Sequence, residues 1–179
     1  MKKLIIFSIS FILLSFVGYY GYTRLNNPVI LKITDITIYN NELNTEVKYF
    51  SSVQQIKSSF GNPDFESNYL SEMDETNLLL LTYSNSKFYF LEDKLVDFEL
   101  VDSKFGLGTI DLGHVNIDNS AEDLTIFDGN FTLSATDQYF KLWLKGDNDE
   151  PFAEEIIFSY AYNPRTNISR INNIMLNSN

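Results

Sequence analysis

The chain opens with a strongly apolar stretch. Two lysines, Lys2 and Lys3, precede a run from Leu4 to Val17 that continues less strictly to Tyr22. As a helix, Leu4 to Tyr22 would span about 28 Å, close to the thickness of a hydrocarbon core. Lysines ahead of such a helix favour a cytosolic N-terminus and export of the residues after the helix. Residues 1–24 are therefore interpreted as a signal anchor or signal peptide, and residues 25–179 as an extracytoplasmic domain.

The choice between anchor and signal peptide depends on a cleavage site. Signal peptidase requires small side chains one and three residues before the cut. The chain has no alanine before Ala121, and the best cut, after Thr23, places Gly21 three residues before it. An uncleaved, single-pass anchor in the cell membrane is therefore favoured. The alternative is a secreted or periplasmic protein after cleavage.

Beyond residue 24, short runs of β-branched, aromatic and alternating residues predict a sheet-rich domain. The predicted strands are Val29–Ile38, Leu43–Tyr49, Leu78–Tyr83, Lys87–Leu91, Leu95–Val101, Ile110–Ile117, Phe131–Ala135, Tyr139–Leu144, Glu155–Tyr162 and Ile168–Leu176. The polar interval Glu66–Asn77 predicts a loop, and Gly106 and Gly108 predict a break. The short connections between successive strands indicate antiparallel meanders.

Two short helices interrupt the strands. Ser51 and Gln54 have the spacing of a capping box, which satisfies free N–H groups where a helix begins. An apolar stripe continues on one face, formed by Val53, Ile56 and Phe60. Gly61 and Pro63 then end the helix. A second capping signal, Ser120 with Asp123, opens another short helix.

The order of these elements predicts an α+β fold with one or two antiparallel sheets and two short helices. The segments Ser52–Ile56 and Ser120–Leu124 share a skeleton, and each leads to a phenylalanine and a glycine. A degenerate tandem repeat with halves 29–105 and 106–179 is one explanation, and chance similarity between two capped helices is the other.

One stretch resembles a known group of envelope domains. A capped helix ending in Phe60-Gly61-Asn62-Pro63-Asp64, with alternating strands after it, is similar to the small helix-plus-antiparallel-sheet domains of bacteria. This group includes the SmpA/OmlA-type outer-membrane lipoproteins and the β-lactamase inhibitor protein. The similarity covers roughly residues 46–101 and implies a binding or scaffolding domain rather than an enzyme. Because this chain lacks the lipidated cysteine of the lipoproteins, the resemblance implies no assembly role.

Composition and charge narrow the range of partners. Hydrophobic residues make up 44% of the chain, enough for a core, and the formal net charge is −11. The three cations of residues 1–24 leave a charge of −14 on the remainder. An acidic domain without a basic stripe is a poor ligand for nucleic acid, so no nucleic-acid partner is expected. With no cysteine, disulfides and thiolate chemistry are excluded.

The remaining residues offer little catalytic or metal-binding chemistry. The single histidine, His114, has no motif around it that supplies a nucleophile or an orienting acid, so a structural role is favoured. Asp147 and Asp149 carry oxygens suited to calcium, but the later ligands of an EF-hand loop are missing and a polar hairpin loop is favoured. We therefore expect no catalytic residue, no metal and no cofactor.

One aromatic group has two interpretations. Alternation from residue 139 to residue 144 places Tyr139, Lys141 and Trp143 on one face of a strand. That face is either a binding surface or part of the core, and core packing is the commoner arrangement for such side chains.

The sequence thus favours a non-catalytic extracytoplasmic protein that binds or scaffolds a protein partner, held to the membrane by its N-terminal helix. An exposed sheet face or edge would make the contact. Two alternatives stay open. One is an envelope carbohydrate hydrolase with paired carboxylates, and the other is a structural or immunity-type envelope protein.

Overall fold

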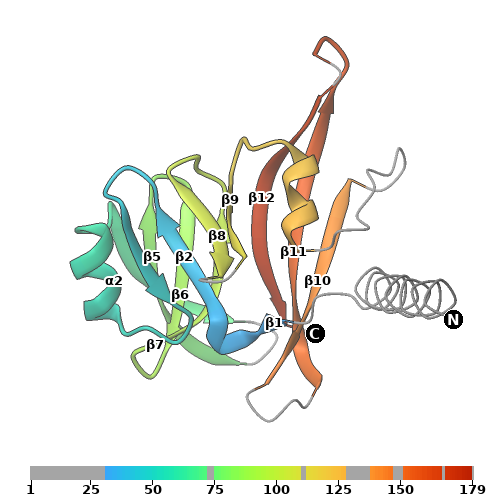
Figure 1. Cartoon of the computed structure of the whole chain (residues 1–179). Coiled ribbons are helices and arrows are strands. Elements are labelled where there is room, and N and C mark those ends of the chain that lie inside the picture. Colours follow the sequence, from blue (N-terminus) through green and yellow to red (C-terminus); the bar gives the residue numbers. More distant parts are fainter. Residues whose placement is uncertain are drawn as a thin grey trace, which may run out of the picture.

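The computed structural model describes residues 31–71, 75–109, 112–127, 138–146, 151–166 and 168–178. They form two sheets and a few short helices (Figure 1). The larger sheet has eight strands, in spatial order β1 (Leu31–Lys32), β10 (Tyr139–Lys145), β11 (Pro151–Asn163), β12 (Ile168–Ser178), β7 (Lys94–Leu100), β6 (Ser86–Leu91), β5 (Thr76–Tyr83) and β4 (Phe65–Ser71). The smaller sheet has four, in the order β3 (Thr45–Lys48), β2 (Ile36–Asn40), β8 (Phe105–Thr109) and β9 (Gly113–Asn116).

Within the described ranges, three helical segments accompany the sheets. They are the 3-10 turn η1 (Ile33–Asp35), the α-helix α2 (Val53–Phe60) and the 3-10 helix η2 (Ala121–Ile126). Among the described strands, every pairing is antiparallel except that of β1 with β10. The predicted mostly antiparallel α+β fold is therefore confirmed.

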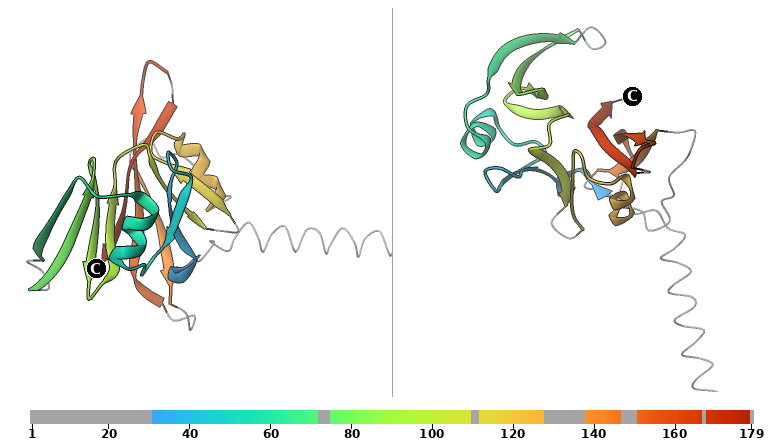
Figure 2. Two further views of the ribbon diagram at one scale, coloured as in Figure 1. Left: turned by 90° about the vertical axis from the view of Figure 1, so that its left-hand side faces the viewer. Right: turned by 90° about the horizontal axis from the view of Figure 1, so that it is seen from above.

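The core lies on one face of the larger sheet. The smaller sheet, α2 and η2 all lie on this side, while strands β4–β7 and β10–β12 are inclined to each other (Figures 1 and 2). The largest fully buried side chains are Phe88, Phe90, Phe98, Phe105, Phe127 and Phe158. Since neighbouring residues of a strand point to opposite faces, the alternate residues of the same strands form a second face, turned away from the core. We call it the outer face.

An aromatic cluster fixes α2 between the two sheets. Phe60, at the end of α2, contacts Tyr83 of β5, Phe88 of β6 and Phe105 of β8, with ring centroids 5.4–6.2 Å apart. These tilted and edge-on arrangements are favourable for aromatic rings. The Tyr83 hydroxyl donates a hydrogen bond to the carbonyl of Gly61 at 2.9 Å. An eight-residue helix, too short to be stable alone, is thus held by its buried stripe.

The helix begins one residue later than predicted. Ser52, not Ser51, is the N-cap: its Oγ accepts a hydrogen bond from the Gln55 amide at 3.2 Å, and Gln55 Oε1 accepts one from the Ser52 amide at 2.8 Å. The expected capping box is present in this shifted register. Gly61 ends the helix with φ of 84°, a conformation that glycine adopts without strain.

Other predictions along the chain were also wrong. The expected loop Glu66–Asn77 contains β4, an edge strand whose side chains are mostly exposed on both faces, so no apolar alternation marked it. The expected first strand is interrupted, because η1 separates β1 from β2.

The two glycines expected to break the pattern lie inside β8. A Cβ atom on Gly106 would lie 2.0 Å from Asn116 Oδ1, and one on Gly108 would lie 2.0 Å from the Gly113 carbonyl oxygen. Their absent side chains therefore allow β9 to approach β8 closely. In this strand glycine serves a packing role rather than marking a turn.

Strands from the first and second parts of the chain pair with each other at the centre of both sheets. In the smaller sheet, the hairpins β2–β3 and β8–β9 join through β2 and β8, where Ile38 lies opposite Leu107. In the larger sheet, the last strands of the two meanders join through β7 and β12, where Leu100 lies opposite Ile174. Both junctions are antiparallel.

Several expected elements lie outside the described residues: the leader 1–24, the strand Phe131–Ala135 and the acidic residues Asp147 and Asp149. Within the ranges that the structure does describe, no helix has both the length and the apolar character needed to cross a bilayer.

The environment of Tyr83 predicts a pH-dependent effect of the Tyr83→Phe substitution. Burial, followed by the charges of Glu66 and Asp64, raises the pKa of Tyr83 to about 12, against about 10 in an unfolded chain. Below pH 10 the variant should lose about 1 kcal/mol, because the hydrogen bond to Gly61 is absent. The raised pKa favours the folded wild type only at pH values at which Tyr83 is also protonated in the unfolded chain. The difference in free energy of unfolding between wild type and variant should therefore shrink as the pH rises from 10 to 12. Urea denaturation at several pH values measures it, and a difference that does not change over this range would contradict the assignment.

Candidate functional site

The outer face of the larger sheet is the most extensive candidate surface. Strand registers of the described residues place a series of large apolar or aromatic side chains on it, all exposed or partly exposed: Phe65, Tyr69, Leu78, Leu80, Tyr89, Leu91, Tyr139, Trp143, Ile157, Ile168 and Met175. Among the described residues and away from the turns, its charged side chains are three cations and three acids: Lys87, Lys141, Arg170, Asp97, Glu99 and Glu155. The face is therefore close to charge balance, whereas the chain as a whole carries −11.

The three residues singled out from the sequence lie on this face. In β10, Tyr139, Lys141 and Trp143 are exposed, while the residues between them are partly or fully buried, so the predicted alternation is confirmed. Tyr139 is 49% exposed and Trp143 is 56% exposed. The expectation that these rings pack in the core was therefore wrong. Their neighbours Leu142 and Leu144 fill the core instead.

Beside Trp143, an ion pair joins β10 to β11. Lys141 Nζ lies 2.5 Å from Glu155 Oε1, and the Lys141 ammonium also lies 5.9 Å from the ring centre of Tyr139. The Glu155 side chain is only 1% exposed, against 40% for Lys141. Glu155 lies opposite Trp143 in the register. A buried carboxylate is costly without a cation, so Lys141 holds this part of the face in place.

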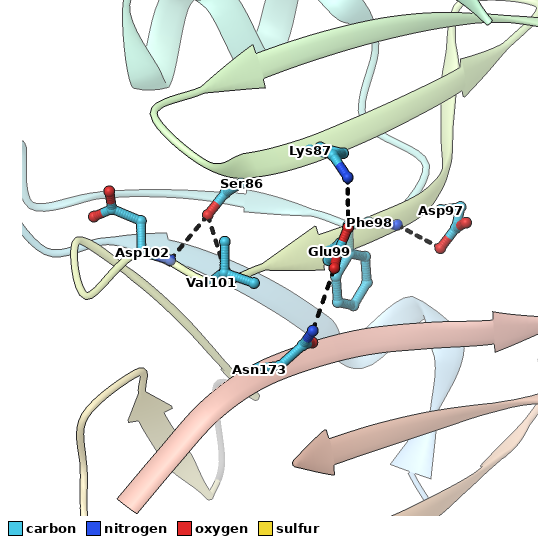
Figure 3. Close-up of polar contacts among 8 residues, drawn as sticks. All are labelled: Ser86, Lys87, Asp97, Phe98, Glu99, Val101, Asp102 and Asn173. Atoms are coloured by element: carbon cyan, nitrogen blue, oxygen red, sulfur yellow. Dashed lines mark hydrogen bonds and ion pairs between the residues drawn. The ribbon is translucent and has the colours of Figure 1, made fainter. Parts of the chain in front are cut away.

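A second polar group crosses the junction between β7 and β12 (Figure 3). Glu99 accepts hydrogen bonds from Lys87 of β6 at 3.0 Å and from the Asn173 side chain of β12 at 3.3 Å. The hydrogen bond from Lys87 is also the main reason that the pKa of Lys87 is raised. Nearby, buried Ser86 accepts hydrogen bonds from the amides of Val101 and Asp102, which ends β7. These contacts make the outer face continuous across the junction.

A further aromatic group lies at the far end of the same face. Phe65 is 60% exposed and Tyr69 is 44% exposed on β4, and Tyr69 contacts Tyr89 edge-on with ring centroids 5.2 Å apart. Burial raises the pKa of Tyr89, opposed by the nearby Lys87. Sequence reasoning missed this group because it assigned residues 66–77 to a loop. The signal that could have revealed it was the pair of aromatic residues Phe65 and Tyr69, whose even spacing places both on one face of a strand.

The smaller sheet carries a separate polar hollow of about 460 Å³, beside the β2–β3 turn. Its lining residues are Tyr39, Asn40, Asn41, Asn44, Thr45, Glu46, Ser59 and His114. The His114 ring stacks on Tyr39 with centroids 4.4 Å apart. Burial raises the pKa of Tyr39, and the Glu46 carboxylate, which accepts a hydrogen bond from it, raises it further. His114 therefore lies at the surface, in contact with a tyrosine.

The chemistry of this hollow is limited. Glu46 is its one carboxylate among the residues that the structure describes, whereas glycoside hydrolysis normally uses two. Across the described ranges, no three histidine, aspartate or glutamate side chains gather as metal ligands would. The outer face, with its exposed aromatic side chains, is therefore the better candidate site.

Comparisons with protein-family models, with curated proteins and with solved structures each find no match. The resemblance to small envelope domains, carried by Phe60–Asp64, stays a prediction.

The two ion pairs of the outer face should differ in strength. We expect Lys141→Met to lower the free energy of unfolding by about 1–3 kcal/mol, because it removes the cation beside a nearly fully buried carboxylate. The matched substitution Lys87→Met should cost less than about 1 kcal/mol, because both partners are substantially exposed, at 42% and 29%. Chemical denaturation of both variants measures the difference. Equal losses would show that the buried carboxylate does not depend on Lys141.

Proposed function

We propose that this chain is a single-pass membrane protein whose residues 25–179 lie outside the cytoplasm and bind a protein partner without catalysis. The charged and apolar pattern of residues 1–22 supports the location. The outer face supports the activity, because a large exposed apolar patch on a soluble domain commonly marks an interaction surface.

The observation that carries the proposal is the exposure of Tyr139 and Trp143. These rings lie beside the Lys141–Glu155 pair, which holds their strand against β11. Tyrosine and tryptophan combine a large contact area with few rotatable bonds, so they lose little entropy on binding and are enriched in interface hot spots. A second aromatic group on β4 and β6 extends the same surface.

We also propose that the domain arose by internal duplication, with halves 29–105 and 106–179. The pairing of equivalent strands at both sheet centres supports it. So does the equivalence of the helix caps: Ser52 precedes α2 and Ser120 precedes η2, and each serine side chain accepts a backbone hydrogen bond. The halves also exchange contacts, since β1 pairs with β10. They therefore form one cooperative unit rather than two separate domains.

Site-specific photocrosslinking in living cells tests the proposed function. A photoreactive phenylalanine analogue replaces Trp143 in the full-length chain, and in a matched variant it replaces Leu43. Leu43 is similarly exposed, at 52%, but lies in the turn between β2 and β3. Irradiation should give a discrete protein adduct from position 143 and little or none from position 43.

The absence of an adduct from position 143 would contradict the proposal. Equal adducts from both positions would do so as well, because they would indicate unspecific proximity rather than a binding face.

A further inference from the structure

The edge strand β4 differs from the other sheet edges within the described residues. It spans seven residues, and only β5 pairs with it. The opposite edge of the same sheet, β1, has two residues. The edges of the smaller sheet, β3 and β9, have four each, and α2 packs against β3. In an antiparallel pair, about half of the backbone N–H and C=O groups of an edge strand point away from its neighbour.

This edge carries few of the features that normally prevent pairing with another chain. Residues 65–71 include neither proline nor lysine. Phe65 and Tyr69 are exposed on the outer face, and Leu70, on the opposite face of the strand, is 57% exposed. An added strand would therefore find apolar side chains on both faces of β4.

The charge of the sequence segment that contains β4 determines which chain would pair with it. Between Lys57 and Lys87 the sequence contains five acids and no base: Asp64, Glu66, Glu72, Asp74 and Glu75. Only one of the five is in a described salt bridge, Glu66 with Lys57 at 2.6 Å. A second copy of this chain would bring two such acidic segments together and be repelled. A cationic segment would be attracted.

We propose that β4 binds an extended, cationic segment of the partner protein by strand addition, which lengthens the eight-stranded sheet by one strand. Main-chain hydrogen bonds supply the affinity, as in other cases of β-augmentation. Apolar side chains of the segment lie beside Phe65 and Tyr69 on the outer face. Its lysines or arginines lie on the other face, beside Glu66. This inference rests on the proposed function and specifies the chemistry of the partner.

A synthetic peptide of defined pattern tests the inference. The probe is Lys-Val-Lys-Val-Lys-Val-Lys with blocked ends, added to the full-length protein in a mild detergent. The matched control, Lys-Pro-Lys-Pro-Lys-Pro-Lys, has the same charge and is also extended, but proline cannot donate a ladder hydrogen bond. The first peptide should slow hydrogen exchange of backbone amides in residues 65–71, and the control should not.

Two leucine substitutions test whether the peptide pairs with the edge of β4 or is only attracted to the acidic protein as a whole. Leu70→Lys adds a cation at the edge, and Leu43→Lys makes the same change of charge at a similarly exposed site elsewhere. Leu70→Lys should weaken peptide binding by about fivefold or more, and Leu43→Lys should weaken it much less.

Three outcomes would overturn the inference. The two peptides could both slow hydrogen exchange in residues 65–71, neither peptide could change it, or the two leucine substitutions could weaken peptide binding equally. Photocrosslinking from position 143 is independent of β4. An adduct there without a peptide effect would refute strand addition and leave the proposed function standing, and failure of both experiments would refute both.

Discussion

The molecule depends on a short antiparallel junction between its two meanders. β7 and β12 pair through only two residue pairs, Leu100 with Ile174 and Glu99 with Met175. Leu100 and Ile174 are fully buried on the core face, while Glu99 binds side chains from both halves on the other. The smaller sheet repeats this connection beneath it, through β2 and β8. Without the junction, each meander would be a separate small sheet and the outer face would not be continuous.

The described elements cover only one face of the larger sheet, and this has a functional consequence. An eight-stranded sheet has two faces, and the short helices and the four-stranded sheet cover only one of them. The described elements leave the other face open to solvent or to another molecule. The Lys87–Glu99 pair lies near its centre, whereas exposed aromatic rings lie toward both ends, and the Lys141–Glu155 pair lies beside the rings of β10. Exposed aromatic rings spread along a broad face, with charged pairs between and beside them, are better suited to a protein partner than to a small molecule.

Much of the fold could be predicted from the sequence because most strands have one face buried in the core and one face more exposed to solvent. The meander β5–β7 and the strands β10–β12 were predicted close to their observed bounds, and alternation correctly grouped Tyr139, Lys141 and Trp143. Elements without that contrast were missed. β4 is exposed on both faces, and β8 is fully buried and contains Gly106 and Gly108, whose role depends on a partner strand. Whether Trp143 packs in the core or faces outward also depends on which face of the sheet the rest of the chain covers, and local pattern carries no information about that.

Cysteine labelling in cells tests the central claim most directly, since the natural chain has no cysteine. Trp143→Cys and Leu43→Cys are compared with a membrane-impermeant maleimide, first in cells whose cytoplasmic membrane is intact and then after purification. The account predicts that Leu43→Cys reacts readily in cells, that Trp143→Cys reacts much more slowly there, and that both react readily once purified. Labelling of neither position until the cells are lysed would contradict the extracytoplasmic location, and equal labelling of the two in cells would show that nothing covers the outer face.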